Sequence, residues 1–398
     1  MKKLLNTAEE IKDAIVYDRR HLHQNAEAGL ETPKTKEYII KRLKEMGYTP
    51  EECGIGGIKA EIGKGEKTVL LRADTDALPI SEETDLPYRA SENMHACGHD
   101  MHTAMLLGAA QILKNNEDIL KNKVVFMFQS GEEILEGAKD MIENGILDGV
   151  DEAVMIHVIT AVDMPTGTVI IGSPGAGAPA SDHFTIEIQG KSCHGSAPWN
   201  GVDSLLIASQ ILNTLQVLQS REVDIRKETV LTIGCMQGGQ NGNTIADTAV
   251  LKGTARSFDE KTREYLKSRI IEISDSVAKT YRGSAKVTFT GGTPVFVNER
   301  HLSSRTFESL KTLLNREYVF TTAMISPDGR VARGGGSEDF AYVSEKVPSI
   351  MIAITAGEKE KGYKFPQHHP KAEFDESVLS LGAAIYASCG MSVSDAKH

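Results

Sequence analysis

The sequence predicts an α/β protein whose main domain has a mainly parallel sheet and is interrupted by a smaller inserted domain. Short apolar runs such as residues 67–74 (KTVLLRAD) and 123–130 (KVVFMFQS) are typical of strands buried on both faces of a parallel sheet. Segments with apolar residues at helical spacing alternate with these runs, which favours an α/β arrangement. A stretch of glycine, proline and small residues at 172–182 separates this pattern from a different one.

Helices and strands are predicted in turn along the first part of the chain. Residues 6–27 begin with an Asn-Thr pair that resembles an N-cap, and residues 32–47 form a second amphipathic helix that ends at Gly47. The order continues with a strand at 67–74, a helix at 100–116, a strand at 123–130, a helix at 136–145 and a strand at 152–158.

The pattern after the small-residue stretch has the order β-α-β-β-α-β, which is the split order of ferredoxin-like domains. It consists of a strand at 183–191, a helix at 203–221, strands at 229–238 and 248–258, a helix at 260–281 and a strand at 285–292. Residues 291–298 resemble a return linker, and a strand at 349–355 and a terminal helix at 375–390 then resume the first pattern. We therefore expect residues 1–181 and 295–398 to form one discontinuous domain, with residues 182–294 inserted.

Composition excludes several classes of function. The 398 residues are enough for two hydrophobic cores, and the net charge of −11 with no basic cluster argues against nucleic-acid binding. No apolar stretch reaches 18 residues, and the N-terminus lacks the apolar core of a signal peptide. The odd, scattered set of five cysteines favours a reducing cytoplasm over a disulfide framework. We expect a cytoplasmic protein that acts on a small molecule and binds neither nucleic acid nor membrane.

Residues that can bind metals recur at the ends of the predicted strands. They are Asp74 and Asp76, then Cys97, His99, Asp100 and His102, then Glu132 and Glu133, His157, and finally His368 and His369. The functional crevice of an open α/β sheet lies outside the carboxyl ends of its strands. Five separate segments are therefore expected to bring acids, imidazoles and a thiol to one edge.

Each of these residues also has an ordinary structural explanation. A lone histidine at a strand end is more often part of the structure, a Glu-Glu pair suits the start of a helix, and a cytosolic cysteine is usually a small apolar residue. The coincidence of all of them at one edge favours a site. Carboxylate, imidazole and thiolate ligands suit a pair of divalent ions, which can activate water by lowering its pKa. One of two adjacent glutamates could bind metal while the other moves a proton.

The chain resembles the amidohydrolase branch of the M20 metallopeptidases, which includes N-acyl-amino-acid amidohydrolases, hippurate hydrolases and plant auxin-conjugate hydrolases. The resemblance spans nearly the whole chain, and its most specific block is CGHD. It is carried, in order, by RRHLHQNAEAG, LRADTDALPI, MHACGHDMHTAMLLGAA, GEE, CHGSAP and GSEDFAY. It implies a metal-dependent hydrolase of N-acyl amino acids or related small conjugates and dipeptides. It also implies a two-metal catalytic domain with an inserted lid through which the protein forms a homodimer.

The resemblance also implies roles for individual residues. Glu132 would be the general base and acid, and Asp76 would orient a group of the metal site, although a helix-capping role is an alternative. His95 and His102 would be structural or supporting residues, and Asp100 would cap the following helix or hold a ligand histidine. His369 would be only a neighbour. The implied ligands are Cys97, as the bridge between the two metals, His99, Glu133, His157 and His368.

The inserted domain would supply groups that contact the substrate. His194 in CHGSAP matches a histidine that reaches a neighbouring active site and stabilises the developing oxyanion. Asn243 and Arg256 match positions that hold a substrate carboxylate, for which the bidentate arginine fork is suited. A loop histidine and a strand-surface arginine are the structural alternatives.

Two other functions remain open at this point. One is deacetylation of a biosynthetic intermediate such as N-acetyl-diaminopimelate, and the other is binding of a metal or ligand without catalysis. The presence of both Glu132 and Glu133 argues against the second, because metal binding alone would need only Glu133. Cysteine ligation favours Zn²⁺, while the oxygen ligands and the resemblance leave Mn²⁺, Co²⁺ and Ni²⁺ open.

Overall fold

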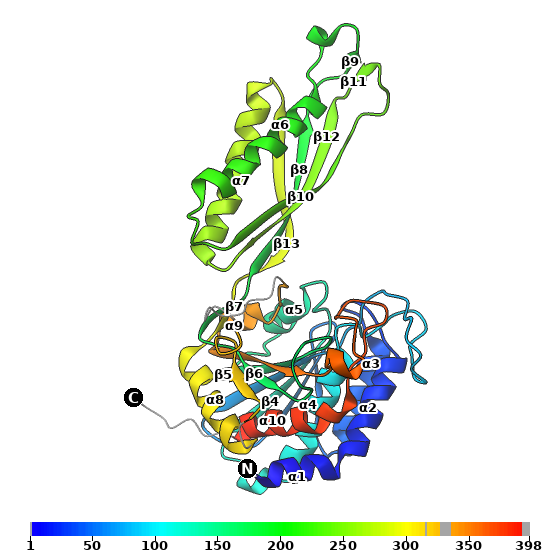
Figure 1. Cartoon of the computed structure of the whole chain (residues 1–398), viewed down its shortest axis with the longest axis vertical. Coiled ribbons are helices and arrows are strands. Elements are labelled where there is room, and N and C mark those ends of the chain that lie inside the picture. The colour runs from blue at the N-terminus through cyan, green and yellow to red at the C-terminus, as the bar shows by residue number, and fades with distance from the viewer. Residues whose placement is uncertain (1, 315–316, 327–335, 392–398) are drawn as a thin grey trace. The chain divides into compact units, whose positions relative to one another are not determined.

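The computed structural model describes residues 2–314, 317–326 and 336–391. The chain forms two compact units: the second contains Ala178–Phe296 together with Gly336 and Ser337, and the first is built from the rest of the described chain on both sides of Ala178–Phe296 (Figure 1). In the part of the chain that the structure describes, no helix is long and apolar enough to cross a membrane.

The first unit is built on a mixed sheet whose centre is parallel. Strand β3 pairs in parallel with β4 and β5, β5 with β16, and β6 with β15. The pairs β1–β2, β2–β4 and β6–β16 are antiparallel. This agrees with the predicted α/β class. Among the described residues the spatial order is β1 (Glu51–Cys53), β2 (Gly57–Ile62), β4 (Lys123–Gln129), β3 (Thr68–Asp74), β5 (Glu152–Ile159), β16 (Ser349–Thr355), β6 (Val169–Ile171) and β15 (Val319–Thr321).

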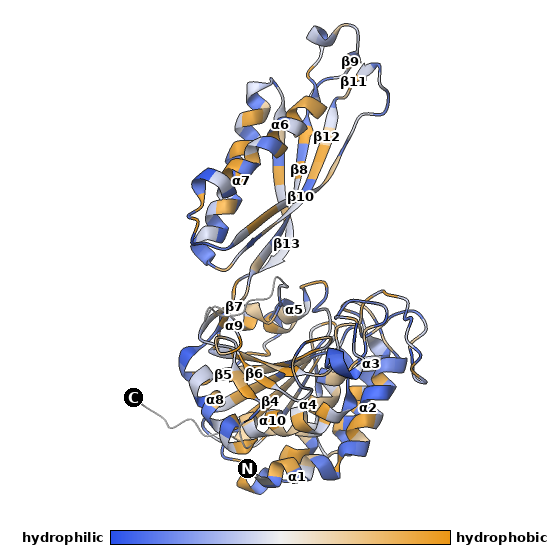
Figure 2. Ribbon diagram, viewed as in Figure 1, coloured by the Kyte–Doolittle hydropathy of each residue, from blue (hydrophilic) through white to orange (hydrophobic). Residues whose placement is uncertain are grey.

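Two apolar helices form the centre of the first unit's core together with one face of its sheet. Nearly every residue of α4 (His99–Lys114) and of α10 (Leu379–Met391) is buried, as expected of helices that are apolar on all sides (Figure 2). The remaining helices of this unit are α1 (Lys2–Glu10), α2 (Lys12–Gln24), α3 (Pro33–Glu45), α5 (Gly137–Glu143), α8 (Arg300–Leu313) and α9 (Ala341–Ser344).

Alternation along β3 sends its side chains to different faces of the sheet. Val69, Leu71 and Ala73 belong to the core cluster that contains the α4 and α10 side chains. Arg72 is also fully buried, but its guanidinium contacts the sulfur of Met155 and the carboxylate of Asp339. A charge therefore lies within a strand whose other members are mostly apolar.

The second unit has the element order β-α-β-β-α-β, and all of its main strand pairs are antiparallel. Its helices α6 (Ser204–Val217) and α7 (Glu260–Thr280) lie side by side and share an apolar core with the sheet (Figure 1). The side chains of Asp203 and Asp259 cap the two helices. The strands lie in the order β10 (Thr229–Gly238), β12 (Thr248–Ser257), β8 (Ala180–Gln189) and β13 (Ser284–Thr293).

Short two-stranded pairs complete the fold. In the second unit β9 (Cys193–His194) pairs with β11 (Thr244–Ile245). Strands β7 (Gly175–Ala178) and β14 (Phe296–Asn298) pair where the chain passes between the units.

The structure differs from the predicted elements mainly at the N-terminus and the sheet edges. The predicted helix at 6–27 is interrupted at Ile11, whose φ of −103° and ψ of 9° leave the helical range. No glycine or proline marks that break in the sequence. Strands β1, β2, β6 and β15 were not predicted, because strands of only three to six residues, at or next to the edges of the sheet, give no long apolar run.

Candidate metal centre

The five predicted ligands come from four segments and meet in two overlapping groups. Cys97 and His99 lie at the start of α4, Glu133 follows β4, His157 lies in β5 and His368 follows β16. One group is Cys97, His99 and His157, and the other is Cys97, Glu133 and His368; within each group the candidate ligand atoms lie within 4.8 Å of one another. Cys97 is the member that the two groups share.

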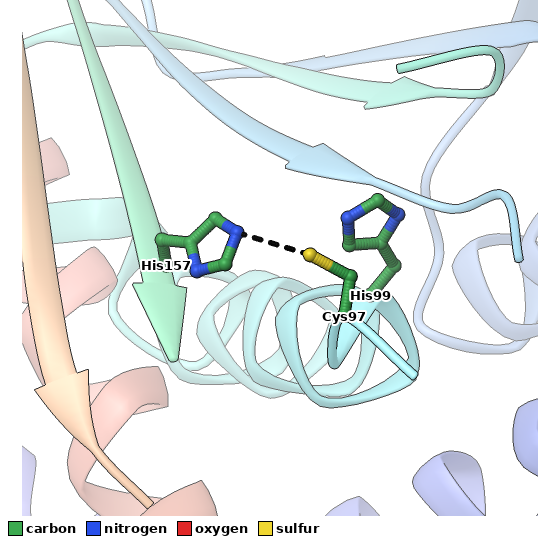
Figure 3. A group of neighbouring side chains, drawn as sticks. All are labelled: Cys97, His99 and His157. Atoms are coloured by element: carbon green, nitrogen blue, oxygen red, sulfur yellow. Dashed lines mark hydrogen bonds between the residues drawn. The ribbon is translucent and has the colours of Figure 1, made fainter. Parts of the chain in front are cut away.

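The turn that presents Cys97 and His99 depends on Gly98. Gly98 is the N-cap of α4 and has φ +93°, in the left-handed region that favours glycine. A Cβ at this position would clash with a methyl group of Val158. Figure 3 shows the outcome: the Cys97 sulfur points toward the ring of His157, with His99 beside it, and Sγ lies 3.5 Å from His157 Nε2.

Two of the predicted ligand histidines have their ring orientation fixed by backbone carbonyls. His99 Nδ1 donates to the carbonyl of Asp76 at 2.8 Å, and His157 Nδ1 donates to that of Val158 at 2.7 Å. Each ring therefore presents Nε2, the other nitrogen, to the site, which is the arrangement found in metal-binding histidines. The buried His99 Nε2 and Glu133 Oε1 have no hydrogen-bond partner among the described residues.

The pKa values of Cys97, Glu133 and His157 are consistent with a site that binds cations. Burial raises the pKa of the Cys97 thiol to about 12 and that of Glu133 to about 7. Burial also lowers the pKa of His157, which keeps the imidazole neutral and available as a ligand. A thiolate and a carboxylate in this buried position need nearby positive charge. Thiolate, imidazole and carboxylate donors together suit a pair of divalent ions.

Glu132 lies beside the ligands in a more enclosed position. One of its carboxylate oxygens is 4.0 Å from His99 Nε2. Burial and the nearby carboxylates of Glu338 and Asp339 raise the pKa of Glu132 well above its usual range. A carboxylate with a raised pKa at a reactive site is typical of a group that exchanges protons near neutral pH.

Asp76 makes hydrogen bonds to the backbone of the two adjacent glutamates. Its carboxylate accepts the backbone N–H groups of Glu132 at 3.1 Å and of Glu133 at 3.2 Å. Its carbonyl accepts His99 Nδ1. Asp76 thus contacts the backbone of a turn and one predicted ligand ring; the N–H groups that it accepts lie in the turn at residues 132–135 and not in a helix.

A buried carboxylate network lies behind Glu132, and most of it was missed from the sequence. Arg72 pairs with Asp74 at 2.7 Å, with Glu338 at 3.0 Å and with Asp339 at 2.9 Å. Glu338 and Asp339 stand in the GSEDFAY segment, but that segment gave no reason to assign them a role. The available signal was Arg72 itself, a charge within an apolar strand.

Most of the other polar residues near the turn contact side chains or backbone groups outside the predicted ligand set. His102 Nδ1 pairs with Asp74, and its Nε2 accepts the N–H of Val158. Asp100 contacts no predicted ligand histidine: its Oδ2 faces Arg19 and His23, and its Oδ1 accepts the N–H of Met101 in the first turn of α4. Both ring nitrogens of the buried His95 lack a partner in the described part of the chain. His369 stacks on Phe365 with ring centroids 4.4 Å apart.

Within the second unit, His194 and Asn243 are neighbours. Thr244 pairs with His194 in the β9–β11 ladder, and the carbonyl of Asn243 accepts the N–H of Gly195 at 2.7 Å. His194 is exposed, and its Nδ1 accepts the N–H and faces the hydroxyl of Ser196. This leaves the proton on Nε2, which is free to donate.

Arg256 occupies a different place in the second unit. It lies on β12 and donates from Nη1 to the hydroxyl of Ser337, which belongs to the same unit, at 2.6 Å.

Comparison with known proteins gives a consistent result. A model of peptidase family M20/M25/M40 matches residues 70–391. The chain is 37% identical to N-acetyl-L-cysteine deacetylase of Bacillus subtilis (strain 168), over 91% of this chain and 83% of that protein. It is 34% identical to thermostable carboxypeptidase 2 of Saccharolobus solfataricus, over 97% of each.

A solved structure is similar over the same extent. A dinuclear metal-binding peptidase of the M20 family from Bacillus subtilis aligns with a TM-score of 0.80 and 28% identity, over 96% of this chain and 98% of that one.

Proposed function

The chain belongs to peptidase family M20/M25/M40 and hydrolyses amide bonds, and we propose that its substrates are N-acyl amino acids or related small conjugates and dipeptides. The observation that carries this proposal is the pair of ligand groups that share Cys97. The unpartnered His99 Nε2 and Glu133 Oε1 add support, because buried polar atoms of this kind are normally satisfied.

The proposed ligands of two divalent ions are Cys97, as the bridge, with His99, Glu133, His157 and His368. Ions bound there would supply Lewis acidity toward the amide carbonyl and lower the pKa of water in the site. We propose Zn²⁺ as the native metal because of the thiolate, with Mn²⁺ as the nearest alternative and Co²⁺ or Ni²⁺ as further ones.

Glu132 is proposed to carry the proton during the reaction. In its ionised form it removes a proton from the attacking water, and it then returns that proton to the leaving amine. Asp76 is the positioning residue for this step, since its carboxylate fixes the backbone N–H of Glu132. The raised pKa of Glu132 favours its action as an acid in the second half of the reaction.

The second unit is proposed to be a ferredoxin-like lid, inserted near residues 182–294, through which two chains dimerise. Its β-α-β-β-α-β order and antiparallel sheet support the first part. His194 is the proposed oxyanion donor, with Nε2–H as the donating group. Asn243 and Arg256 are the proposed partners of the substrate carboxylate.

A turnover assay with added metal tests the proposed function. The purified protein, stripped with a chelator, is assayed on N-acetyl, N-benzoyl and indole-acetyl amino acids with Zn²⁺ or Mn²⁺ restored. We expect metal-dependent release of the free amino acid from at least one series. Matched amino-acid amides that lack the free carboxylate should react more slowly, because Arg256 and Asn243 would lose their partner. No turnover of any acyl series with either metal would exclude the proposed substrates.

A further inference from the structure

A buried group of charged side chains lies next to the turn that carries Cys97 and His99. Arg19 and His23 come from α2, Asp100 from the first turn of α4, and Glu82 from the long connection between β3 and α4. Arg19, His23 and Asp100 are at most 2% exposed, and the side chain of Glu82 is fully enclosed. The mechanism proposed above uses none of them.

His23 lies between two carboxylates and contacts one with each ring nitrogen. Its Nδ1 is 2.8 Å from Asp100 Oδ2, and its Nε2 is 3.1 Å from Glu82 Oε2. An ionised carboxylate can only accept a hydrogen bond, so both ring nitrogens must donate. His23 is therefore an imidazolium that joins the two segments. Arg19 Nε lies 2.7 Å from Asp100 Oδ2, and Arg19 Nη1 also donates to Glu376 Oε1 at 3.2 Å.

Each carboxylate is also fixed to its own segment. Asp100 Oδ1 accepts the N–H of Met101 at 2.9 Å, within the first turn of α4. Glu82 accepts the N–H of Ala90 at 2.7 Å and the hydroxyl of Thr84, which closes the connection on itself. His23 thus links two segments to the same point on α2. One is the connection that leads to Cys97, and the other is the start of α4, which contains His99.

We infer that His23 is a positioning residue for the metal ligands, and that its ionic clamp, made with Asp100 and Glu82, holds the Cys97–Gly98–His99 turn in the shape that binds metal. This inference rests on the proposed function for the identity of the ligands. A preorganised turn binds metal tightly because little conformational entropy is lost when the metal binds. When the clamp is lost, the turn must be ordered by the metal itself, which weakens metal binding.

The test compares two substitutions on the same helix. His23→Gln removes the imidazolium, whereas His21→Gln removes a half-buried imidazole that stacks on Tyr38 and, among the described residues, contacts no carboxylate at hydrogen-bond distance. Zn²⁺ affinity is measured by competition with a chelator, and Tm is measured in excess chelator. We expect His23→Gln to weaken Zn²⁺ binding about 10–100-fold, the range seen when residues that orient ligands are changed. His21→Gln should bind Zn²⁺ as the wild type does.

A further pair of variants separates positioning from a general loss of stability. Ile15→Val, in the core-facing part of α2, should lower Tm and leave Zn²⁺ affinity unchanged. Glu82→Gln added to His23→Gln removes the other partner of the same contact, and it should therefore cause little further loss of affinity beyond that of His23→Gln alone. If His23→Gln does not fold, Glu82→Gln alone replaces it, with a smaller loss of affinity expected.

The outcomes distinguish this inference from the proposed function. Failure of the wild type to bind Zn²⁺ would contradict the proposed metal site. Wild-type affinity in both His23→Gln and Glu82→Gln would overturn the clamp while leaving the metal site intact. Additive losses in the double variant would also overturn it, because a shared ionic clamp requires coupling between the two residues.

Discussion

Cys97 is the proposed ligand that, among the described residues, is common to both three-residue groups of proposed ligands. Its thiol cannot easily ionise without a nearby cation, since burial raises its pKa to about 12. A thiolate between two ions would be stabilised by both of them.

Substitution of Cys97 by alanine is therefore expected to remove bound metal together with activity. The change deletes one ligand from each group at once. Metal analysis of the purified variant is the measurement, and Cys53→Ala is the matched control because Cys53 is also a buried, free cysteine of the first unit. Full metal occupancy in an inactive Cys97→Ala protein would contradict the bridging role.

Substitutions of the two adjacent glutamates should differ in their effects on metal binding and on kcat. Glu132→Gln is expected to retain both metals and to lose about 10²–10⁴ in kcat, the usual contribution of a positioned acid or base. Glu133→Gln is expected to lose metal affinity first. Metal content and kcat are measured on both variants in parallel. Near wild-type turnover by Glu132→Gln would show that another group moves the proton.

The proposed ligands could be inferred from the sequence more readily than the residues that contact them. Each proposed ligand has a side chain that suits metal and lies at the end of a predicted element or in a connection between two of them. Their supporting contacts join residues far apart in the chain and give no local pattern. Arg72 and Asp339, for example, are 267 positions apart.

At the scale of elements, α2 contributes more than a packing surface to the first unit. Its residue His23 joins the connection after β3 to the start of α4. Burial opposes protonation of His23, but hydrogen bonds to Asp100 and Glu82 raise its pKa above the usual value. Arg19 and His95 also face it, and Arg19 lowers that pKa in part. The charges of Asp100 and Glu82 persist near neutral pH, because their own pKa values are lowered.

This arrangement predicts a pH-dependent contribution of His23 to stability. Its folded-state pKa lies above the value of about 6.5 for an unpaired histidine, so the contribution is fully present below that pH. It is lost as the pH rises through the raised pKa. The difference in free energy of unfolding between the wild type and His23→Gln, measured with urea in excess chelator, should be largest near pH 6 and shrink toward pH 9. The corresponding difference for Ile15→Val should not change with pH. A constant difference for His23→Gln would mean that the ring contributes by packing alone.

The burial and length of each strand explain which strands could be predicted from the sequence. Strands β3, β4, β5 and β16 are almost entirely buried, so each gives a continuous apolar run. The edge strand β1 has two exposed residues in three, and β15 is only three residues long. Tertiary pairing rather than local pattern makes these segments strands.

At the scale of the whole molecule, the proposed catalytic groups are divided between two units. The proposed ligands and Glu132 belong to the first unit, whereas His194 belongs to the second. His194 is exposed, and Ser196 fixes the tautomer of its ring with the proton on Nε2. A donor of this kind suits an oxyanion that forms on a substrate bound in another chain. This is the role that the resemblance to M20 amidohydrolases implies for His194.

His194→Ala is expected to lower kcat by about 10²–10³ with metal content unchanged, because a positioned oxyanion donor contributes roughly 3–4 kcal/mol in the transition state.

The proposed dimer gives a sharper test. In a mixed dimer of His194→Ala and Glu132→Gln chains, one active site combines an intact Glu132 with the intact His194 of the other chain. Mixing the two inactive proteins under conditions of subunit exchange should therefore restore activity. Exchange itself is monitored with differently tagged chains, and each variant incubated alone is the control. If tagged chains exchange and activity does not return, His194 acts within its own chain or outside catalysis. A wild type that is monomeric at assay concentrations would exclude action between subunits altogether.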